Sequence, residues 1–349
     1  MSQTDPTAAG SGDDQPTPAD QLDQTLGVVW TGPTEEFPTQ PWPSGRAERD
    51  RPASDTCSVC GGVVDPDGYC TQCGAKAKSV RDHWIEAPAD WVAGVCDSGL
   101  VHPHNEDALA TAATAEPGRR AVIVVCDGVT TSQDSDLASL AAARRARDLL
   151  WSDQPQGLGL SRTQAAATAQ RLRQAIQAAN RAVIEATAPD SPNPASATIA
   201  LAEVAGSTCF WATLGDSRVY WLPDQAEAVL LSQDHSLAQA QIDQGVSRQA
   251  AEASVLAHTI TKWLGLDAVD LEPSAGQFQL DRPGWVLVCS DGLWNYASSA
   301  PALRQAFEQA ASQPEPTDSP LALARRLVDW ANGQGGHDNV TVGLARCGV

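Results

Sequence analysis

Short runs of consecutive apolar residues, many of them ending at an acid or a glycine, are the most regular feature of the chain from residue 88 onward. Runs of this length predict buried strands. The predicted strands are 92–96, 122–126, 197–205, 207–214, 218–223, 285–289 and 339–345, and the polar segment DSGLVHPHNEDALA that starts at 97 leads into another. Segments with helical periodicity predict helices at 136–151, 161–186, 237–243, 247–253, 301–311 and 320–331. This order predicts an α+β fold, in which antiparallel sheets pack together and helices lie outside.

Residues 1–54 show no such pattern and are rich in Pro, Gly, Ser, Thr, Asp and Gln. A segment of this composition cannot bury enough apolar surface to offset the entropy of ordering. We therefore expect a disordered acidic tail at 1–54, followed by a small cysteine-containing module at 55–79 and a large domain at 88–349.

Charge and hydropathy exclude several classes of function. The 349 residues include 43 acidic and 23 basic ones, a net charge of −20, whereas nucleic-acid binding needs clustered Lys and Arg. No apolar run approaches the roughly 20 residues that span a bilayer. The N-terminus lacks the basic and apolar segments of a secretion signal. We expect a cytoplasmic protein that binds neither nucleic acid nor membrane, with its oligomeric state left open.

Four of the nine cysteines form two C-x2-C pairs separated by nine residues: Cys57, Cys60, Cys70 and Cys73. Two such pairs can complete a tetrahedral site of four thiolates, which suits zinc first and iron second. A redox-active dithiol is the alternative. The sequence DPDG between the pairs predicts a hairpin. The module resembles a zinc ribbon, with a structural role because four thiolates leave no open coordination position.

Three acids stand where predicted strands meet the surface. Asp127 and Asp291 follow apolar runs, and Asp338 precedes the last one. One such residue is usually a turn residue or a helix cap, but three together indicate a single oxygen-rich site for Mg²⁺ or Mn²⁺. Glu106 and Asp107, in the polar run HPHNED, are expected to hold metal-bound waters or to orient the ligands.

At these motifs the sequence resembles the metal-dependent PP2C family of protein serine/threonine phosphatases, over roughly residues 88–349. The motifs are GLVHPHNED, VVCDG, LGDSRVY, LSQDHS, VCSDGLW and GGHDNVTV, in this order. The resemblance implies a β-sandwich of two antiparallel sheets flanked by helices, with two Mn²⁺ or Mg²⁺ ions at one end. It also implies that the partners are phosphorylated Ser/Thr proteins, the products of cellular kinases.

The resemblance further assigns roles to the acids. Asp127 would bridge both ions and the Gly128 carbonyl would bind one, while Asp291 and Asp338 would bind the other. Glu106 and Asp107 would contact metal-bound water. A hydroxide bridging two ions about 3.5–4 Å apart would attack the phosphorus in line, without a covalent phosphoenzyme.

Two departures from the family pattern concern the substrate. Many members have an arginine that grips the phosphate where this chain has His102, and a neutral imidazole offers one hydrogen bond in place of a charged fork. His102 therefore either weakens phosphate binding or simply packs beside the site. The glycine-rich turn that usually follows the DG motif in the family is replaced here by Val-Thr-Thr-Ser at 129–132. A third metal is associated with bacterial relatives, with Asp190 as its candidate ligand here, whereas Asp216 is expected in a hairpin turn.

Two other functions remain open at this point. One is a catalytically weak, phosphatase-like module that binds phosphoproteins, which only His102 favours. The other is a phosphatase of small phosphorylated metabolites, which would need a deep, closed pocket.

Overall fold

The structure, a computed structural model, describes residues 52, 54–57, 60–152, 161–313 and 317–348. The tail predicted at 1–54 therefore lies outside the described residues, except for positions 52 and 54. The described residues all belong to one compact unit, Gly45–Val349.

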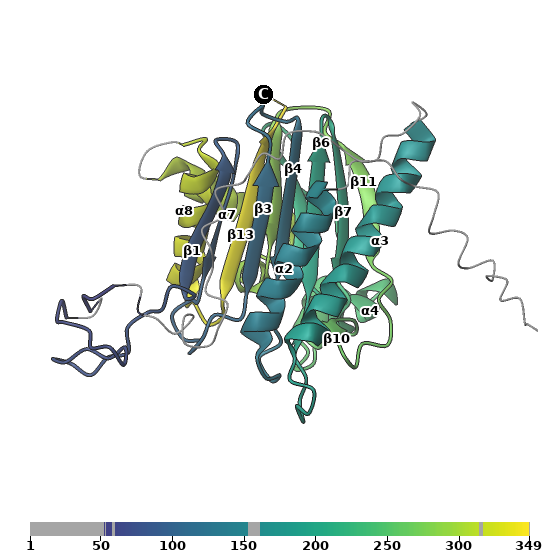
Figure 1. Cartoon of the computed structure of the whole chain (residues 1–349). Helices are drawn as coiled ribbons and strands as arrows, with labels where there is room; N and C mark the ends of the chain where they lie inside the picture. The colour runs from purple at the N-terminus through teal and green to yellow at the C-terminus, as the bar shows by residue number, and fades with distance from the viewer. Residues whose placement is uncertain (1–51, 53, 58–59, 153–160, 314–316, 349) are drawn as a thin grey trace, which may run out of the picture. The chain divides into compact units, whose positions relative to one another are not determined.

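Two antiparallel sheets form the centre of this unit (Figure 1). The six-stranded sheet has the order β1 (His83–Ala89), β2 (Val92–Asp97), β13 (Val340–Cys347), β12 (Gly284–Cys289), β8 (Arg218–Pro223) and β9 (Val229–Leu230). The five-stranded sheet has the order β11 (Ser274–Gln279), β7 (Thr208–Leu214), β6 (Ile199–Ala205), β4 (Arg120–Cys126) and β3 (Ala108–Ala113). A small pair joins β5 (Ser196–Ala197) to β10 (Leu264–Gly265).

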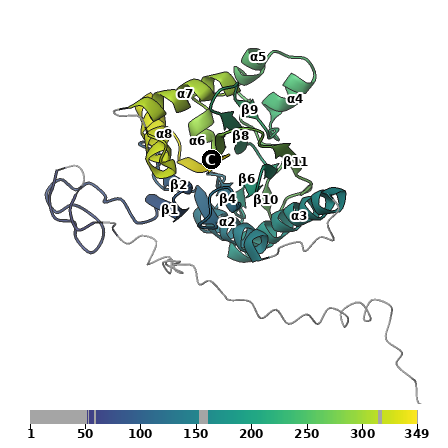
Figure 2. The same ribbon diagram turned by 90° about the horizontal axis from the view of Figure 1, so that it is seen from above.

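Helices cover the outer faces of both sheets (Figure 2). The five-stranded sheet packs against α2 (Ser135–Ser152) and α3 (Ser161–Ala186), and the six-stranded sheet packs against α6 (Asp291–Trp294), α7 (Ala300–Ser312) and α8 (Pro320–Gln334). Two short helices, α4 (Leu237–Asp243) and α5 (Arg248–Glu252), follow β9. No helix in these described ranges is long and apolar enough to cross a bilayer.

The inner faces of the two sheets meet closely at two glycines. Gly94 on β2 and Gly343 on β13 are cross-strand neighbours. A Cβ on Gly94 would lie 2.6 Å from Leu109 Cδ2, and one on Gly343 would lie 2.5 Å from Ile123 Cγ2. Both apolar side chains belong to the five-stranded sheet, and they occupy the space that a Cβ on either glycine would need. The predicted α+β sandwich is confirmed.

The edge strands β1, β9 and β11 and the two-residue strand β10 were not predicted from the sequence. β1 and β11 each lie at the edge of a sheet, and the burial of β11 alternates from residue to residue. Such strands lack the continuous apolar runs of central strands that are covered on both faces. The predicted strands and helices otherwise match the observed ones to within a few residues at their ends.

We expect Gly292→Ala to lower the free energy of unfolding by about 2 kcal/mol or more, because the added methyl group would overlap the carbonyl oxygen of Asn339. The matched control is Gly333→Ala, also in a helix, where no atom lies within 4 Å of the new Cβ. That change should raise the free energy of unfolding by about 0.5–1 kcal/mol. Urea denaturation measures both, and equal effects would contradict the packing assigned to Gly292.

Candidate metal centre

Asp127 and Gly128 are held at the end of β4 by the neighbouring chain. The backbone N–H of Asp127 donates to Thr198 Oγ1 (3.3 Å), and Thr198 N donates to the carbonyl of Asp127 (2.8 Å). Gly128 N donates to the carbonyl of Glu106 (3.1 Å). A Cβ at Gly128 would lie only 2.7 Å from that same carbonyl oxygen, so the close approach of the two loops requires glycine here.

Asp291 and Asp338 are brought together by the pairing of β12 with β13. These strands are antiparallel neighbours, so the end of β12 lies beside the start of β13. This explains why one acid follows its strand and the other precedes it. Asn295 Nδ2 donates to Asp291 Oδ2 (3.0 Å), and Asn339 N donates to Asp338 Oδ1 (2.8 Å).

Glu106 and Asp107 connect the loop before β3 to the same region. Asp107 is 1% exposed, and its Oδ2 accepts hydrogen bonds from Ser290 Oγ and Thr341 Oγ1, both at 2.7 Å. Glu106 Oε1 accepts a hydrogen bond from Ser135 Oγ at 2.6 Å. The two acids are therefore held by side chains from three different elements.

The acids form one electrostatic cluster. Burial raises the pKa of Asp127 well above its usual value, and four carboxylates raise it further: Asp107, Asp291, Asp338 and Asp216. Burial likewise raises the pKa of Asp107 to about 8 and that of Asp291 to about 6. Closely spaced carboxylates of this kind are costly to ionise together unless cations compensate them.

The cluster fits a divalent-cation centre. Asp291 Oδ1 and Glu106 Oε2 are both buried and lack a hydrogen-bond partner among the described residues. Carboxylate oxygens are the hard ligands that Mg²⁺ and Mn²⁺ prefer, and a bound cation would compensate the two oxygens that have no donor.

Comparisons with known proteins show the family of this chain. The family model described as "Protein phosphatase 2C" matches residues 102–331. This chain belongs to the protein phosphatase 2C family. The serine/threonine protein phosphatase PstP of Mycobacterium tuberculosis is 28% identical over 255 residues, which cover 71% of this chain and 43% of PstP. The chain thus spans less than half the length of that relative.

Solved structures of the same fold include a serine/threonine phosphatase of S. agalactiae, with a TM-score of 0.60 and 23% identity, covering 76% of this chain and all of that chain. Another is the catalytic domain of PstP in complex with two manganese ions, with a TM-score of 0.54 and 23% identity. It covers 75% of this protein phosphatase 2C chain and 98% of the PstP chain.

Sequence reasoning missed two residues of the acidic cluster. Asp216 lies in the turn between β7 and β8, as expected, but its carboxyl is buried and adds to the repulsion at Asp127. Asn339 is 3% exposed and joins the start of β13 to the loop between β2 and β3: it donates to the carbonyls of Ser98 (3.0 Å) and His104 (2.9 Å) and accepts from Glu106 N (2.7 Å). The motifs GDSR and HDN, which contain Asp216 and Asn339, were the sequence signals that could have indicated these two residues.

Asp190 and His102 lie outside this cluster. Asp190 is exposed in a turn, and no contact within the described ranges joins it to the clustered acids, so its role as a third-metal ligand stays a prediction. His102 is half-buried, with Nδ1 3.2 Å from the carbonyl oxygen of His104 and Nε2 3.4 Å from Thr130 Oγ1. It therefore connects its own loop to the one after Gly128, where the family pattern is also altered.

The four clustered cysteines form a second candidate metal site. Their Sγ atoms all lie within 4.8 Å of one another, with Cys57 3.7 Å from Cys73 and Cys60 3.4 Å from Cys70. Four sulfur ligands at about 2.3 Å from one ion would lie about 3.8 Å apart. Backbone hydrogen bonds, first from Cys73 and then from Gln72, lower the pKa of the Cys70 thiol to about 6. The predicted hairpin is present, with Gly68 N donating to the Asp65 carbonyl.

The pKa shifts predict how pH acts on the protein free of Mn²⁺ and Mg²⁺. Asp107 and Asp291 have higher pKa values folded than unfolded, so their protons stabilise the fold fully below about pH 4. This stabilisation is lost as pH rises through about 6 and about 8, so the melting temperature should fall over that range. Added Mn²⁺ should reverse the slope, and Asp107→Asn should flatten it. Melting curves from pH 4 to 9 test this; a metal-free protein that gains stability across that range would contradict it.

Proposed function

We propose that this protein is a metal-dependent phosphatase that hydrolyses phosphoserine and phosphothreonine in proteins. The observation that supports this most is the meeting of Asp127, Asp291 and Asp338 in one partly buried acidic cluster within a protein phosphatase 2C fold. The cluster also holds two buried carboxylate oxygens that lack a donor. We further propose that the protein acts in cytoplasmic signalling.

We assign the roles as follows. Asp127, the Gly128 carbonyl, Asp291 and Asp338 would hold two Mn²⁺ or Mg²⁺ ions. Bound there, the ions would lower the pKa of a water and offset charge on the phosphoryl oxygens. Glu106 and Asp107 would orient water molecules at the centre. The hydroxyls that bond Asp107, and Asn339 behind Glu106, hold these two acids in position.

The test is Mn²⁺-dependent phosphate release from phosphothreonine peptides, with p-nitrophenyl phosphate as a small substrate. The parent should release phosphate from the peptides, and Asp338→Ala should not. Equal release by both proteins would overturn the assignment of the centre. Binding of phosphopeptides without release would favour the binding-module alternative, and release from small esters alone would favour the metabolite phosphatase.

His102 gives a separate prediction about phosphate binding. We expect His102→Arg to lower KM for a phosphothreonine peptide about fivefold with little change in kcat, because a guanidinium offers a charged fork to phosphate. His83→Arg is the control, since His83 is an exposed residue of β1 that pairs with Asp97. An unchanged or higher KM for His102→Arg would show that His102 only packs beside the site.

We also propose that the four-cysteine cluster holds one structural Zn²⁺. Both thiolate pairs are formed by tight turns, in which Gly61 N donates to the Cys57 carbonyl (2.9 Å) and Gly74 N donates to the Cys70 carbonyl (2.9 Å). Gly61 and Gly74 both have positive φ, of 75° and 73°, which favours glycine. The chain would thus consist of a tail at 1–54, a zinc ribbon at 55–79 and a phosphatase domain at 88–349.

A further inference from the structure

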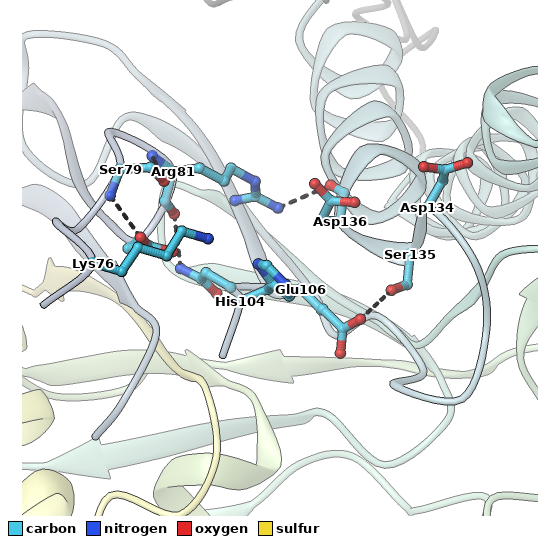
Figure 3. Close-up of a pocket in the computed structure, with 10 residues that line it drawn as sticks. Lys76, Ser79, Arg81, His104, Glu106, Asp134, Ser135 and Asp136 are labelled. Atoms are coloured by element: carbon cyan, nitrogen blue, oxygen red, sulfur yellow. Dashed lines mark hydrogen bonds between the residues drawn. The ribbon is translucent and has the colours of Figure 1, made fainter. Parts of the chain in front are cut away.

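A polar pocket of about 270 Å³ lies next to the candidate metal centre (Figure 3). Three segments line it: the end of the cysteine module with the chain that follows it, the loop before β3, and the first turn of α2. The lining residues are Lys76, Ser79, Arg81, Asp82, His104, Asn105, Glu106, Asp134, Ser135 and Asp136. Glu106 lines this pocket, and its backbone carbonyl accepts the hydrogen bond from Gly128 N, so the pocket borders the segment that carries Asp127.

Four of the ten lining residues lie outside the matched family region, which begins at residue 102. Lys76 pairs with Tyr69 in the hairpin of the cysteine module, and Ala77 N donates to the Gly68 carbonyl (2.8 Å). The cysteine module therefore positions Lys76 at the pocket. One side of the pocket is thus formed by residues that precede the region matched by the family model.

Several basic side chains of the pocket have unused hydrogen-bond donors or ring nitrogens. In the described part of the chain, the Lys76 ammonium and the His104 ring form no hydrogen bond or ion pair. Arg81 is 6% exposed, and its Nε and Nη1 are buried without a hydrogen-bond acceptor. Figure 3 shows the Arg81 side chain extending across the pocket toward α2, where Nη2 donates to the Asp136 carbonyl (2.9 Å). Donors buried without an acceptor are costly, so an acceptor from a ligand would be favoured here.

Each carboxylate of the lining, in contrast, has at least one partner within the protein. Asp82 Oδ2 accepts a hydrogen bond from Ser79 N at 2.6 Å. Asp82 and Asp136 lie near enough to Arg81 to compensate its charge, and Asp134 and Asp136 have further partners. The remaining carboxylate, Glu106, accepts a hydrogen bond from Ser135 Oγ through Oε1 (2.6 Å), and its Oε2 lacks a partner among the described residues. The unused hydrogen-bond donors of the charged lining residues therefore belong to Lys76 and Arg81.

The first turn of α2 adds to this preference. Its 18 residues align their peptide dipoles, which places partial positive charge at the end that borders the pocket. Backbone N–H groups at such an end favour an anion, particularly beside a buried arginine with free donors. The N-terminal end of α2 and the Arg81 side chain thus both favour an anionic ligand.

We infer that this pocket binds an anionic group of the substrate, close to the phosphorylated residue that is hydrolysed. The group is a second phosphate or a carboxylate side chain of the same peptide, with Lys76 and Arg81 as its contacts. This inference rests on the proposed phosphatase function. It assigns the cysteine module a part in substrate selection, because that module carries Lys76.

The test compares phosphothreonine peptides whose neighbouring residues are neutral, glutamate, arginine or a second phosphothreonine. KM for the parent should be about fivefold lower for the anionic peptides than for the neutral one, with kcat little changed. The preference should shrink in high salt. Comparison of the glutamate and doubly phosphorylated peptides shows which anion binds better, and preference for either one supports the inference.

Lys76→Ala should remove this preference, and Lys76→Glu should reverse it. Lys76 is exposed, so neither change should disturb folding. The matched control is Lys78→Ala, which alters an exposed lysine that does not line the pocket and lies 3.9 Å from Asp97. Arg81→Gln, made in the parent, should also weaken the preference for anionic peptides. Its melting curve checks that the variant is folded.

Equal KM values in the parent, a preference for the arginine peptide, or an unchanged preference in Lys76→Ala would each overturn the inference while leaving the phosphatase function in place. Failure of the parent to hydrolyse any peptide or p-nitrophenyl phosphate with Mn²⁺ would instead overturn the proposed function itself.

Discussion

Asp127→Asn is expected to lower Mn²⁺-dependent kcat/KM by about three orders of magnitude and, at the same time, to raise the melting temperature of the metal-free protein. The loss of activity follows because the substitution removes a carboxylate that, under the proposed function, would hold the ions. The gain in stability follows because burial and four neighbouring carboxylates raise the pKa of Asp127. Folding at neutral pH must therefore either protonate this carboxyl or bury its charge, a cost that an uncharged amide avoids.

Phosphate release and thermal melting, each with and without Mn²⁺, test both parts of this prediction. The parent should be stabilised by Mn²⁺, and Asp127→Asn should lose most of that stabilisation. The control is Asp148→Asn, which alters an acid on α2 with a side chain that is 60% exposed. An Asp127→Asn protein that retains activity, or that melts at a lower temperature than the metal-free parent, would contradict the proposed centre.

The second large effect concerns the cysteine module. Cys70→Ser should remove one bound zinc per chain and unfold residues 55–79, because the module has little else to hold it together. Its apolar core consists of Cys57, Val64 and Cys70, with Ala75 and Ala77 packed against them. A core of this size supplies far less than the roughly 10–16 kcal/mol that a structural zinc contributes.

Metal analysis and limited proteolysis measure this effect. The parent should bind one zinc and resist cleavage within 55–79, whereas Cys70→Ser should lose both properties. Hydrolysis of p-nitrophenyl phosphate should persist, but the preference for anionic peptides should be lost with the fixed position of Lys76. Cys209→Ala, at a buried cysteine of β7, is the control that should keep its zinc. A parent without zinc, or a zinc-bound Cys70→Ser, would contradict the assignment.

Features that depend on neighbouring residues could be predicted from the sequence. The apolar runs of β4 and β12 are buried on both faces, so composition alone indicates strands, and the acid after each run marks a strand end. The C-x2-C pairs are equally local, because each thiolate pair is formed within one tight turn. The α+β class follows from the order of these elements.

The tertiary structure alone decided which distant residues meet. Asp107 is held by Ser290 and Thr341, more than 180 residues away, and no local pattern specifies these hydrogen bonds. The buried carboxyl of Asp216 was predicted only as a turn residue, since its approach to Asp127 depends on the packing of one sheet on the other. Lys76 and Arg81 likewise could not be identified as binding residues from the sequence. Their side chains share one pocket only because the cysteine module, the loop before β3 and the first turn of α2 pack together. Strands, turns and cysteine pairs are determined by short segments and can be predicted from them. A site assembled from several segments depends on strand pairing and packing between residues far apart in the sequence.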